Sequence, residues 1–382
     1  MKVLVYIPAA VAGPVTGTPL RAINLSRALS RQGCQVELAA LGASDLPDIS
    51  GYALSPRRGF WPRVLWHQAG ELAHIIRQSG CDLVHAHTHL GLFPAALAGK
   101  RTGTPVVADI HGHHLEEAIF FGGLKRNSPR YRFWQLVERF AVTQTAALTV
   151  VCDPLENYLK KWCCRTLVVP GGFDPDFFAP HVAPAPEIEA WKKGRIVVAY
   201  VGNMRPYQGV DLLLESAANL QMGSQARYAF FCLGNQDRNT PYHGWVDRHG
   251  LSDTVLFLGR RPYADIPSFL AAADILVVPR PFTLVSHYAY PSKLSEYIGM
   301  GRAVVATDIG DHHKAIVNMK TGLLVEPTPD ALAEALLKLQ DRQQRERLGG
   351  NARRHAVQNF SWDKLAGDVA GLFQSVLSTG VG

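Results

Sequence analysis

Short apolar runs alternate with longer amphipathic stretches along the whole chain. In the first half, VLVYI precedes the helix-like PLRAINLSRALSRQG, and the same order continues through DLVHAH, PVVADIHG, ALTVVC and TLVVPGG. Uninterrupted apolar runs are typical of strands buried on both faces, and the stretches between them have helical spacing. The pattern predicts an α/β fold built on a doubly wound parallel sheet.

The alternation restarts after a proline-rich, charged segment, FAPHVAPAPEIEAWKKG, which is typical of a linker. The second set of apolar runs is RIVVAYVGN, YAFFCLGN, TVLFLG, DILVVP and RAVVATD. We therefore predict two Rossmann-like domains, 1–182 and 183–359, with a last helix in 360–382 that packs on either one. In such domains ligands bind at the carboxyl ends of the strands, so the two sheets are expected to face each other across a cleft.

One helix of the second half begins with a lysine in an unfavourable place. In PSKLSEYIGMGRAVVA, Pro291 suits the entry to a helix and Ser292 is a candidate N-cap. Lys293 then lies at the positive end of the helix dipole, which costs about 0.3–1 kcal/mol, and Glu296 offsets part of that cost. A helix N-terminus that holds a phosphate would keep such a lysine.

A second turn of the same domain has related chemistry. In VGNMRPYQGVDLLLES, Gly202 and Gly209 permit close backbone approach and Arg205 supplies charge. Taken alone, this is also the pattern of an ordinary strand, turn and helix with a solvated arginine. Together with Lys293, the two turns predict a diphosphate site, and Glu296 is placed to accept hydrogen bonds from a ribose diol.

These motifs, in order along the chain, resemble glycosyltransferase family 4. The resemblance is carried by YVGN…QGVDLLLESA, VLFLGRRPYADIPSFLAAADILVVPRP and YPSKLSEYIGMGRAVVATDIG, and it extends through DLVHAH, PVVADIHG, VVPGGFDPDFFAP and the closing NFSW. It covers nearly the whole chain. It implies the GT-B fold and a retaining enzyme that uses a nucleotide-sugar donor and needs no metal or other cofactor.

The resemblance also implies roles for individual residues. Glu296 matches the glutamate that holds the nucleotide ribose, and Gly17 falls in the loop near the donor phosphates. His111 matches a histidine beside the reacting sugar, and Arg260 and Arg261 fall in the turn where the base packs. The expected donor-binding set also contains Gly202, Asn203, Gln208, Ser292 and Leu294.

The chain departs from the family pattern at three positions. Tyr288 stands where the family often has a first glutamate, and Asn203 and Gln208 replace the usual arginine and lysine of the phosphate turn. A subset of bacterial surface-polysaccharide enzymes resembles this chain in combining GN…QG with PSK. We therefore expect Lys293 and Arg205 to carry the diphosphate charge, with fixed cations and helix N-termini stabilising the leaving group.

Charge points to an anionic partner. The 382 residues have a net charge of +7, and residues 1–180 hold 18 Lys and Arg against 13 Asp and Glu. No nucleic-acid-binding signature accompanies the excess, so an anionic lipid or a phosphorylated small molecule fits better than a nucleic acid.

Apolar runs, the N-terminal stretch and the cysteines indicate in which compartment the protein is expected. No apolar run is long enough to span a bilayer, and Pro8 interrupts a start that mimics a signal peptide. The six cysteines lack metal-ligand or disulfide spacing and are expected to be free thiols. We expect a cytoplasmic protein that can also lie peripherally on the inner face of the membrane.

Two basic, aromatic stretches of the first half suit an anionic membrane surface: SPRRGFWPRVLW (55–66) and FFGGLKRNSPRYRFW (120–134). A lipid-linked acceptor would account for both. Arg57, Arg58 and Arg63 are the predicted contacts. The alternative is a solvated helix whose aromatic residues turn into the core.

Other functions are open at this point. HAHTH is predicted to place His85, His87 and His89 on one side of a strand, and with His111, His113 and His114 it permits a metal-dependent hydrolase, although no acidic set completes a ligand shell. Asp174 to Asp176 (DPD) resembles a metal-binding motif but is read as a turn. The departures at Tyr288, Asn203 and Gln208 also allow a relative that binds nucleotide or glycan without turnover. A dehydrogenase is disfavoured because no G-x-G-x-x-G follows the first strand.

Overall fold

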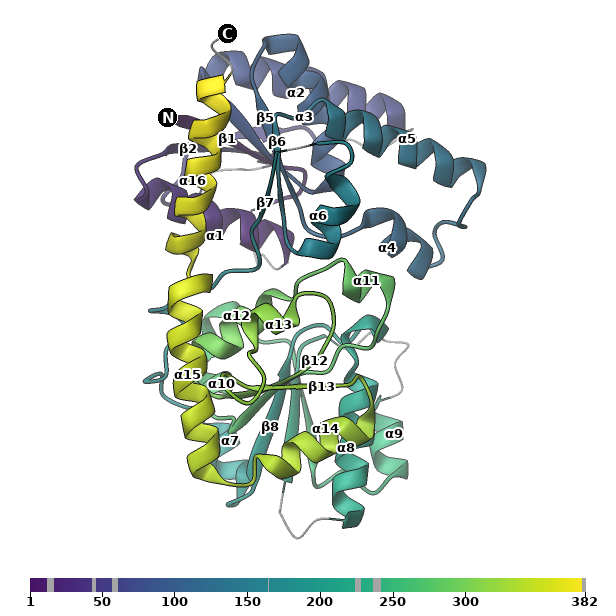
Figure 1. Cartoon of the computed structure of the whole chain (residues 1–382), viewed down its shortest axis with the longest axis vertical. Coiled ribbons are helices and arrows are strands. Elements are labelled where there is room, and N and C mark those ends of the chain that lie inside the picture. Colours follow the sequence, from purple (N-terminus) through teal and green to yellow (C-terminus); the bar gives the residue numbers. More distant parts are fainter. Residues whose placement is uncertain are drawn as a thin grey trace. The chain divides into compact units, whose positions relative to one another are not determined.

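The chain forms two compact units. The computed structural model describes residues 1–11, 17–42, 46–56, 61–163, 165–223, 228–235 and 242–379. Unit 1 comprises 1–170 and 362–382, and unit 2 comprises 171–361. Each unit is an α/β body with its own parallel sheet (Figure 1). The predicted two-domain Rossmann-like α/β fold is confirmed.

Unit 1 contains a seven-stranded parallel sheet in the order β3-β2-β1-β4-β5-β6-β7. Its strands are β1 (Lys2–Ile7), β2 (Gln35–Leu41), β3 (Gly51–Leu54), β4 (Leu83–His87), β5 (Val106–Ile110), β6 (Ala147–Val150) and β7 (Thr166–Val168). Along β1, Val3 and Val5 pack into the core on one face, and Leu4 and Tyr6 pack into the core on the other. Both faces are therefore apolar, which explains the uninterrupted run VLVYI.

Helices cover both faces of this sheet. Those of unit 1 are α1 (Thr18–Arg31), α2 (Trp61–Ser79), α3 (Thr88–Thr102), α4 (His114–Phe120), α5 (Pro129–Thr143), α6 (Asp153–Leu159) and α16 (Trp362–Thr379). α1 and α16 lie side by side and share one core cluster, and α2 and α3 contribute to the other (Figure 1).

Unit 2 contains a six-stranded parallel sheet in the order β10-β9-β8-β11-β12-β13. Its strands are β8 (Ile196–Val201), β9 (Tyr228–Leu233), β10 (Val255–Gly259), β11 (Ile275–Val278), β12 (Ala303–Thr307) and β13 (Leu323–Val325). Its helices are α7 (Pro186–Lys192), α8 (Val210–Gly223), α9 (Tyr242–Arg248), α10 (Ile266–Ala271), α11 (Leu284–His287), α12 (Ser292–Gly299), α13 (His312–Ala315), α14 (Pro329–Lys338) and α15 (Arg342–Phe360), with short 3₁₀ turns η1 (Pro206–Gln208) and η2 (Tyr263–Asp265).

The unit boundary differs from the predicted 182/183. Residues 171–182 group with unit 2 because their backbone bonds to it: the N–H of Phe173 donates to Phe360 O, and Arg353 donates to Phe178 O and Pro175 O. The predicted linker also contains α7, with Ile188 fully buried. The proline-rich composition was therefore misleading, because a proline at the start of a helix removes no internal hydrogen bond.

Two expectations from the sequence, on membrane-spanning segments and on the cysteines, can be compared with the described residues. Among the described helices, none combines the length and the apolar character needed to cross a bilayer. The five described cysteines, Cys34, Cys81, Cys152, Cys163 and Cys232, are buried free thiols. Cys164, Arg57 and Arg58 lie outside the described residues.

Candidate active site

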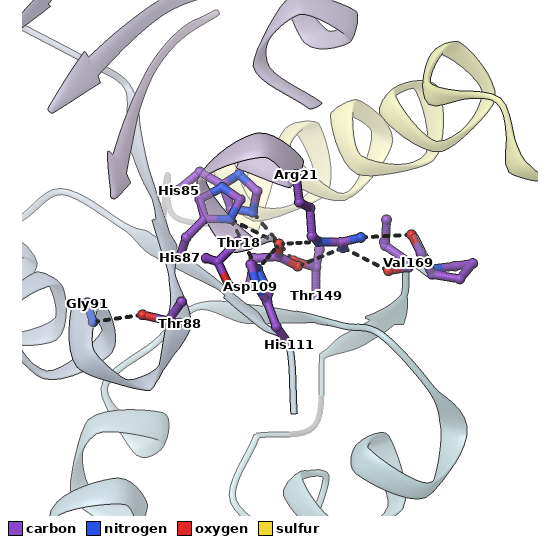
Figure 2. A network of polar contacts seen from close by, with 11 residues as sticks. Thr18, Arg21, His85, His87, Thr88, Gly91, Asp109, His111, Thr149 and Val169 are labelled. Carbon is purple, nitrogen blue, oxygen red and sulfur yellow. Dashed lines mark hydrogen bonds and ion pairs between the residues drawn. The ribbon is translucent and has the colours of Figure 1, made fainter. Parts of the chain in front are cut away.

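A buried carboxylate organises the carboxyl end of the unit 1 sheet (Figure 2). Asp109, near the end of β5, is fully buried and accepts a hydrogen bond from Thr149 Oγ1 at 2.7 Å. His111 Nε2 lies 2.7 Å and His87 Nδ1 lies 3.1 Å from its Oδ2 atom. Burial by itself raises the pKa of Asp109, but the charge of Arg21 and the contacts of His111 outweigh it and hold that pKa well below its usual range.

Arg21 supplies the positive charge that makes this burial possible. It lies in the first turn of α1, and its Nε and Nη2 atoms donate to the two oxygens of Asp109 at 2.9 and 3.1 Å. Nη2 and Nη1 also donate to the carbonyls of Val169 and Pro170, both at 2.8 Å. The bidentate pair and the two carbonyls use four donor contacts of this guanidinium, so Arg21 joins α1 to β5 and to the segment after β7.

His111 is held in one orientation by Asp109. The carboxylate accepts from Nε2–H, which assigns the proton to Nε2 and leaves Nδ1 as an acceptor for the Thr18 hydroxyl, 3.2 Å away. Burial lowers the pKa of His111 to about 4 against the opposing influence of Asp109. The imidazole is therefore neutral at physiological pH, and its hydrogen-bonding capacity is set by a fixed tautomer.

Gly17 precedes α1 and has a backbone conformation that favours glycine. Its φ is 65° and its ψ is −128°, and its carbonyl accepts the first helical bond from the N–H of Arg21. A side chain at this position would meet strain although nothing lies within 4 Å of it. Residues 12–16 of the same loop lie outside the described part of the chain.

In unit 2, Lys293 leaves the first turn of α12 and folds onto the end of β8. Its Nζ atom donates to Tyr200 Oη at 2.8 Å and to Gln208 Oε1 at 3.0 Å, and it lies 4.1 Å from the centre of the Tyr200 ring. Both of these hydrogen-bond acceptors in the described part of the chain are neutral, a phenol and an amide oxygen, and neither is a carboxylate. Burial, together with the charge of Arg280, lowers the pKa of Lys293 well below its usual value.

Gly202 makes room for this ammonium group. Its φ is 148°, and a Cβ atom there would lie 2.3 Å from Lys293 Nζ. Gly209 is more tightly constrained, since its Cβ would lie 1.8 Å from the backbone carbonyl oxygen of Pro279, whereas the end of a lysine side chain can move. Both glycines are therefore required for close packing, as predicted from the turn. The group that approaches Gly202 in this structure is the lysine side chain.

Glu296 lies one turn further along α12. Its Oε1 atom accepts from Tyr263 Oη at 3.2 Å, and the Tyr263 ring stacks on Phe177 with centroids 5.3 Å apart. Burial raises the pKa of Glu296 to about 7, although the hydrogen bond from Tyr263 and the charge of Lys293 act in the opposite direction. The carboxyl group of Glu296 therefore changes its protonation state near pH 7. Tyr263 holds one oxygen, and the other oxygen can accept a hydrogen bond from a diol.

The other predicted donor-binding residues have more varied environments. Asn203 and Arg205 are exposed, and the N–H of Arg205 contacts Asn203 Oδ1 at 3.4 Å. Gln208 is buried, where it supports Lys293. Arg260 is exposed, and Arg261 is paired with Glu187 at 3.2 Å.

One expectation for the start of α12 needs correction. Ser292 is the first helical residue and not the N-cap, which is Pro291, because the extended backbone of Pro291 ends just before the helix. Leu294, in the predicted donor-binding set, is fully buried, and its N–H donates to Pro291 O.

The HAHTH histidines do not share one side of a strand. β4 ends at His87, and α3 begins at Thr88, whose φ of 66° turns the chain, so His89 is helical. His85 and His87 lie with Asp109, and His89 lies with the side chains of two other segments, His114 and Glu138.

Acidic residues therefore do accompany both histidine groups, contrary to the sequence-based interpretation. The signal for the first was an acid within the buried run VVADI, because a carboxylate in a core strand needs partners. The second, Glu138, comes from a distant amphipathic helix and gave no such signal. By contrast, the prediction for Asp174 is confirmed: its Oδ1 accepts from the N–H groups of Asp176 and Phe177, as in a turn.

Comparison with known families accounts for almost the whole chain. A family model described as Glycosyltransferase Family 4 matches residues 15–177, and one described as Glycosyl transferases group 1 matches residues 183–355. The two matches fall mainly on unit 1 and unit 2 respectively.

Relatives and solved structures agree with these matches. A D-inositol 3-phosphate glycosyltransferase of Salinispora arenicola is 29% identical over an alignment of 318 positions that covers 77% of this chain and 68% of that protein. A glycosyltransferase structure from Rickettsia africae has a TM-score of 0.78 at 18% identity and covers 98% of both chains. Alr3699/HepE of Anabaena in complex with UDP has a TM-score of 0.76 at 19% identity, covering 98% of this chain and 100% of that one.

Proposed function

Because this chain belongs to glycosyltransferase family 4, with a two-domain Rossmann-like fold, we propose that it moves a sugar from a nucleoside diphosphate to a glycan or lipid-linked acceptor of the cell envelope. In the proposed reaction the sugar keeps its anomeric configuration and no metal takes part. In this proposal no covalent glycosyl intermediate forms. The acceptor oxygen then attacks from the face that the diphosphate leaves, and a phosphate oxygen takes its proton.

One observation carries the donor assignment. Lys293 places a cation with no carboxylate partner among the described residues at the N-terminus of α12, beside the glycine turn that follows β8. The backbone N–H groups of a helix start and an unneutralised ammonium are the groups that bind phosphate in proteins. The burial of Lys293 without an anion costs stability, and a bound diphosphate would remove that cost.

In this proposal Gln208 holds Lys293 in place rather than contacting phosphate itself. Where the family usually has a basic residue, this chain has the neutral Gln208, whose Oε1 atom accepts a hydrogen bond from Lys293 of α12. Arg205, exposed in the same turn, supplies a second cation, and Glu296 accepts from the ribose hydroxyls. As negative charge builds on the leaving diphosphate, these fixed groups stabilise it.

We assign His111 to the transferred sugar. Burial keeps its imidazole neutral and Asp109 fixes its orientation, so that it contacts a sugar hydroxyl through hydrogen bonding and not through charge. Asp109 is accordingly a positioning residue.

The test is a panel of UDP, GDP and ADP, each with and without a sugar, followed by thermal melting and by slow donor hydrolysis. A ligand at 100 times its dissociation constant stabilises the fold by about 2.7 kcal/mol. We expect one nucleotide to raise the melting temperature and its sugar conjugate to be hydrolysed. A shift without hydrolysis would indicate the non-catalytic relative, and neither effect with any donor would refute the proposal.

We further propose that unit 1 rests on an anionic membrane surface, on the cytoplasmic side. On α5, Phe133, Leu136 and Phe140 are 50%, 64% and 41% exposed and share one helical face. Exposed arginines flank that face, namely Arg130, Arg132 and Arg139. Exposed apolar side chains beside basic ones suit the headgroup region of an anionic bilayer.

Liposome co-sedimentation tests this surface. Binding should require anionic lipid, weaken with salt, and decrease in a variant that combines Phe133→Ser and Leu136→Ser. Replacement of Arg57, Arg58 and Arg63 by Glu tests the first basic stretch in the same way. Binding that ignores both salt and these substitutions would rule the surface out.

A further inference from the structure

A second histidine–carboxylate group lies in unit 1, apart from the Asp109 network. It consists of His89 in α3, His114 at the start of α4 and Glu138 in α5, and we call it the His89 cluster. His89 Nε2 is 2.9 Å and His114 Nδ1 is 3.5 Å from Glu138 Oε1, and the three atoms lie within 4.8 Å of one another. We propose that this cluster binds a divalent transition-metal ion of the zinc class.

The charge of the His89 cluster is incomplete without a cation. Glu138 is 3% exposed, and in the described part of the chain its ion-pair partners are the two imidazoles alone. Buried carboxylates are normally paired with a lysine or arginine, or coordinate a metal. Asp109 has Arg21 for this purpose, whereas no described guanidinium or ammonium pairs with Glu138.

The ligand atoms point at one another without making good hydrogen bonds. His89 Nε2, His114 Nδ1 and Glu138 Oε1 are each buried, and within the described residues none has a partner with hydrogen-bond geometry. Three donor atoms that converge in this way need a common partner. Tyr158 Oη donates to the other oxygen, Glu138 Oε2, at 2.9 Å and so fixes the carboxylate with Oε1 toward the histidines. That is the role of an outer-shell partner in metal sites.

The donor set and its spacing favour zinc. Two imidazoles and one carboxylate are a recurrent zinc set, with metal–ligand distances of about 2.0–2.2 Å. Ligands at tetrahedral angles around such an ion are about 3.4 Å apart, and the measured 2.9 and 3.5 Å lie on either side of that value. Small side-chain rotations would complete the site.

A fourth position opens toward an apolar cavity. The three residues of the His89 cluster line a cavity of about 280 Å³ together with Leu65, Phe93, Leu115, Trp134 and Val137. A site with three protein ligands and one open position accepts a further donor atom. The ligand that fits carries an oxygen or nitrogen donor on an apolar body.

The Asp109 network is a poorer metal site. Asp109 already accepts from Arg21, Thr149 and His111, so few of its lone pairs are available. The guanidinium of Arg21 also repels a cation at that position. The two histidine groups of HAHTH thus differ in kind, one being neutralised by an arginine and the other open to a metal.

Metal analysis of the full-length, tag-free protein tests the proposal. The protein is stripped with a chelator, loaded with Zn²⁺, passed through gel filtration and assayed for bound zinc by elemental analysis. We expect about one retained zinc per chain and a raised melting temperature. Glu138→Gln and His114→Ala should abolish both effects, and Tyr158→Phe should weaken zinc binding about 10–100-fold.

Glu116→Gln is the matched control. Glu116 is also a buried carboxylate of this region, but it pairs with Arg126, so its loss should leave zinc binding unchanged. His114 is 29% exposed, which makes His114→Ala the decisive variant if Glu138→Gln fails to fold. Cobalt loading of the wild-type protein gives a second readout, with ligand-field bands of a tetrahedral site and no thiolate charge transfer.

Three results would overturn the proposal. These are the absence of stoichiometric zinc in the wild type, zinc retained equally by His114→Ala, and a thiolate spectrum, which would place the metal on a cysteine. None of these results bears on the proposal of transferase activity, which the panel of nucleotide donors tests separately.

Discussion

Lys293→Met separates the binding role of this lysine from its structural cost. The substitution removes the ammonium but keeps an unbranched side chain of similar length against the Tyr200 ring, where a thioether packs well. The Tyr200 hydroxyl still has the Asn203 carbonyl and Gln208 Oε1 as acceptors. The variant therefore loses a buried charge while its former partners keep hydrogen bonds.

Two effects of opposite sign follow. A hydrogen bond to a charged group contributes about 1.5–3 kcal/mol, so the affinity for a nucleoside diphosphate should fall about 10–150-fold. Because desolvation and the charge of Arg280 disfavour the charged form of the half-buried Lys293, the ligand-free protein should melt at the same temperature or higher. For a unit of this size, each kcal/mol gained raises the melting temperature by about 2–4 °C.

The assay is titration calorimetry with the nucleotide that gives the largest thermal shift, alongside melting of the ligand-free protein. Lys320→Met is the control, since Lys320 is an exposed lysine of the same unit, and neither quantity should change. If Lys293→Met kept the wild-type affinity, the phosphate assignment would be refuted. If it lowered the melting temperature by several degrees, Lys293 would be a structural residue.

Three further outcomes are expected. Burial raises the folded-state pKa of Glu296 to about 7, above the usual value of about 4.3, so the folded protein holds that proton more tightly than the unfolded chain does. The stability of the fold should therefore fall as the pH rises between these two values. In a series of melting curves, the Glu296→Gln variant should lack this fall. Nucleotide affinity should change in the opposite direction and rise with pH through 7, because the carboxylate is the better acceptor, and a flat profile would contradict the ribose assignment. Asp109→Asn leaves Arg21 buried without its anion, so chemical denaturation should show a loss of about 3–5 kcal/mol; a loss below about 1 kcal/mol would mean that the network is not the support described above. Gly202→Ala must both strain a backbone φ of 148° and displace Lys293 Nζ. It should lower the free energy of unfolding by about 1–3 kcal/mol and also weaken nucleotide binding. Gly250→Ala, at an open position with positive φ, should show the strain alone.

Much of the fold follows from short-range patterns. Runs such as VLVYI and RIVVAYV are buried on both faces of parallel sheets, so their apolar continuity identified strands directly. The start of α12 was located to within one residue from Pro291 and the helical spacing after it. The predicted linker was wrong because proline and charge are also typical of the first turn of a surface helix such as α7.

The candidate site was less predictable, because its geometry depends on side chains far apart in sequence. The turn motifs located Gly202 and Lys293, but not the fact that the lysine packs on that glycine. Likewise, the pairing of Arg21 with Asp109, 88 residues away, depends on the order of the strands. Sequence spacing pointed to candidate residues and left their partners undetermined.

The path of the backbone has a practical consequence for dissecting the molecule. The chain leaves unit 1 after Pro170 and returns to it at Trp362, where α16 supplies Leu365, Val369 and Phe373 to the same core as α1. A fragment that stops at the first crossing lacks α16 and would expose the apolar surface of unit 1 that this helix covers, and deleting the tail would damage the half of the protein that is translated first. Unit 2 is the contiguous piece, so 171–361 is the natural span for isolated expression, whereas its counterpart has to be made as a permuted chain that joins the tail to the beginning.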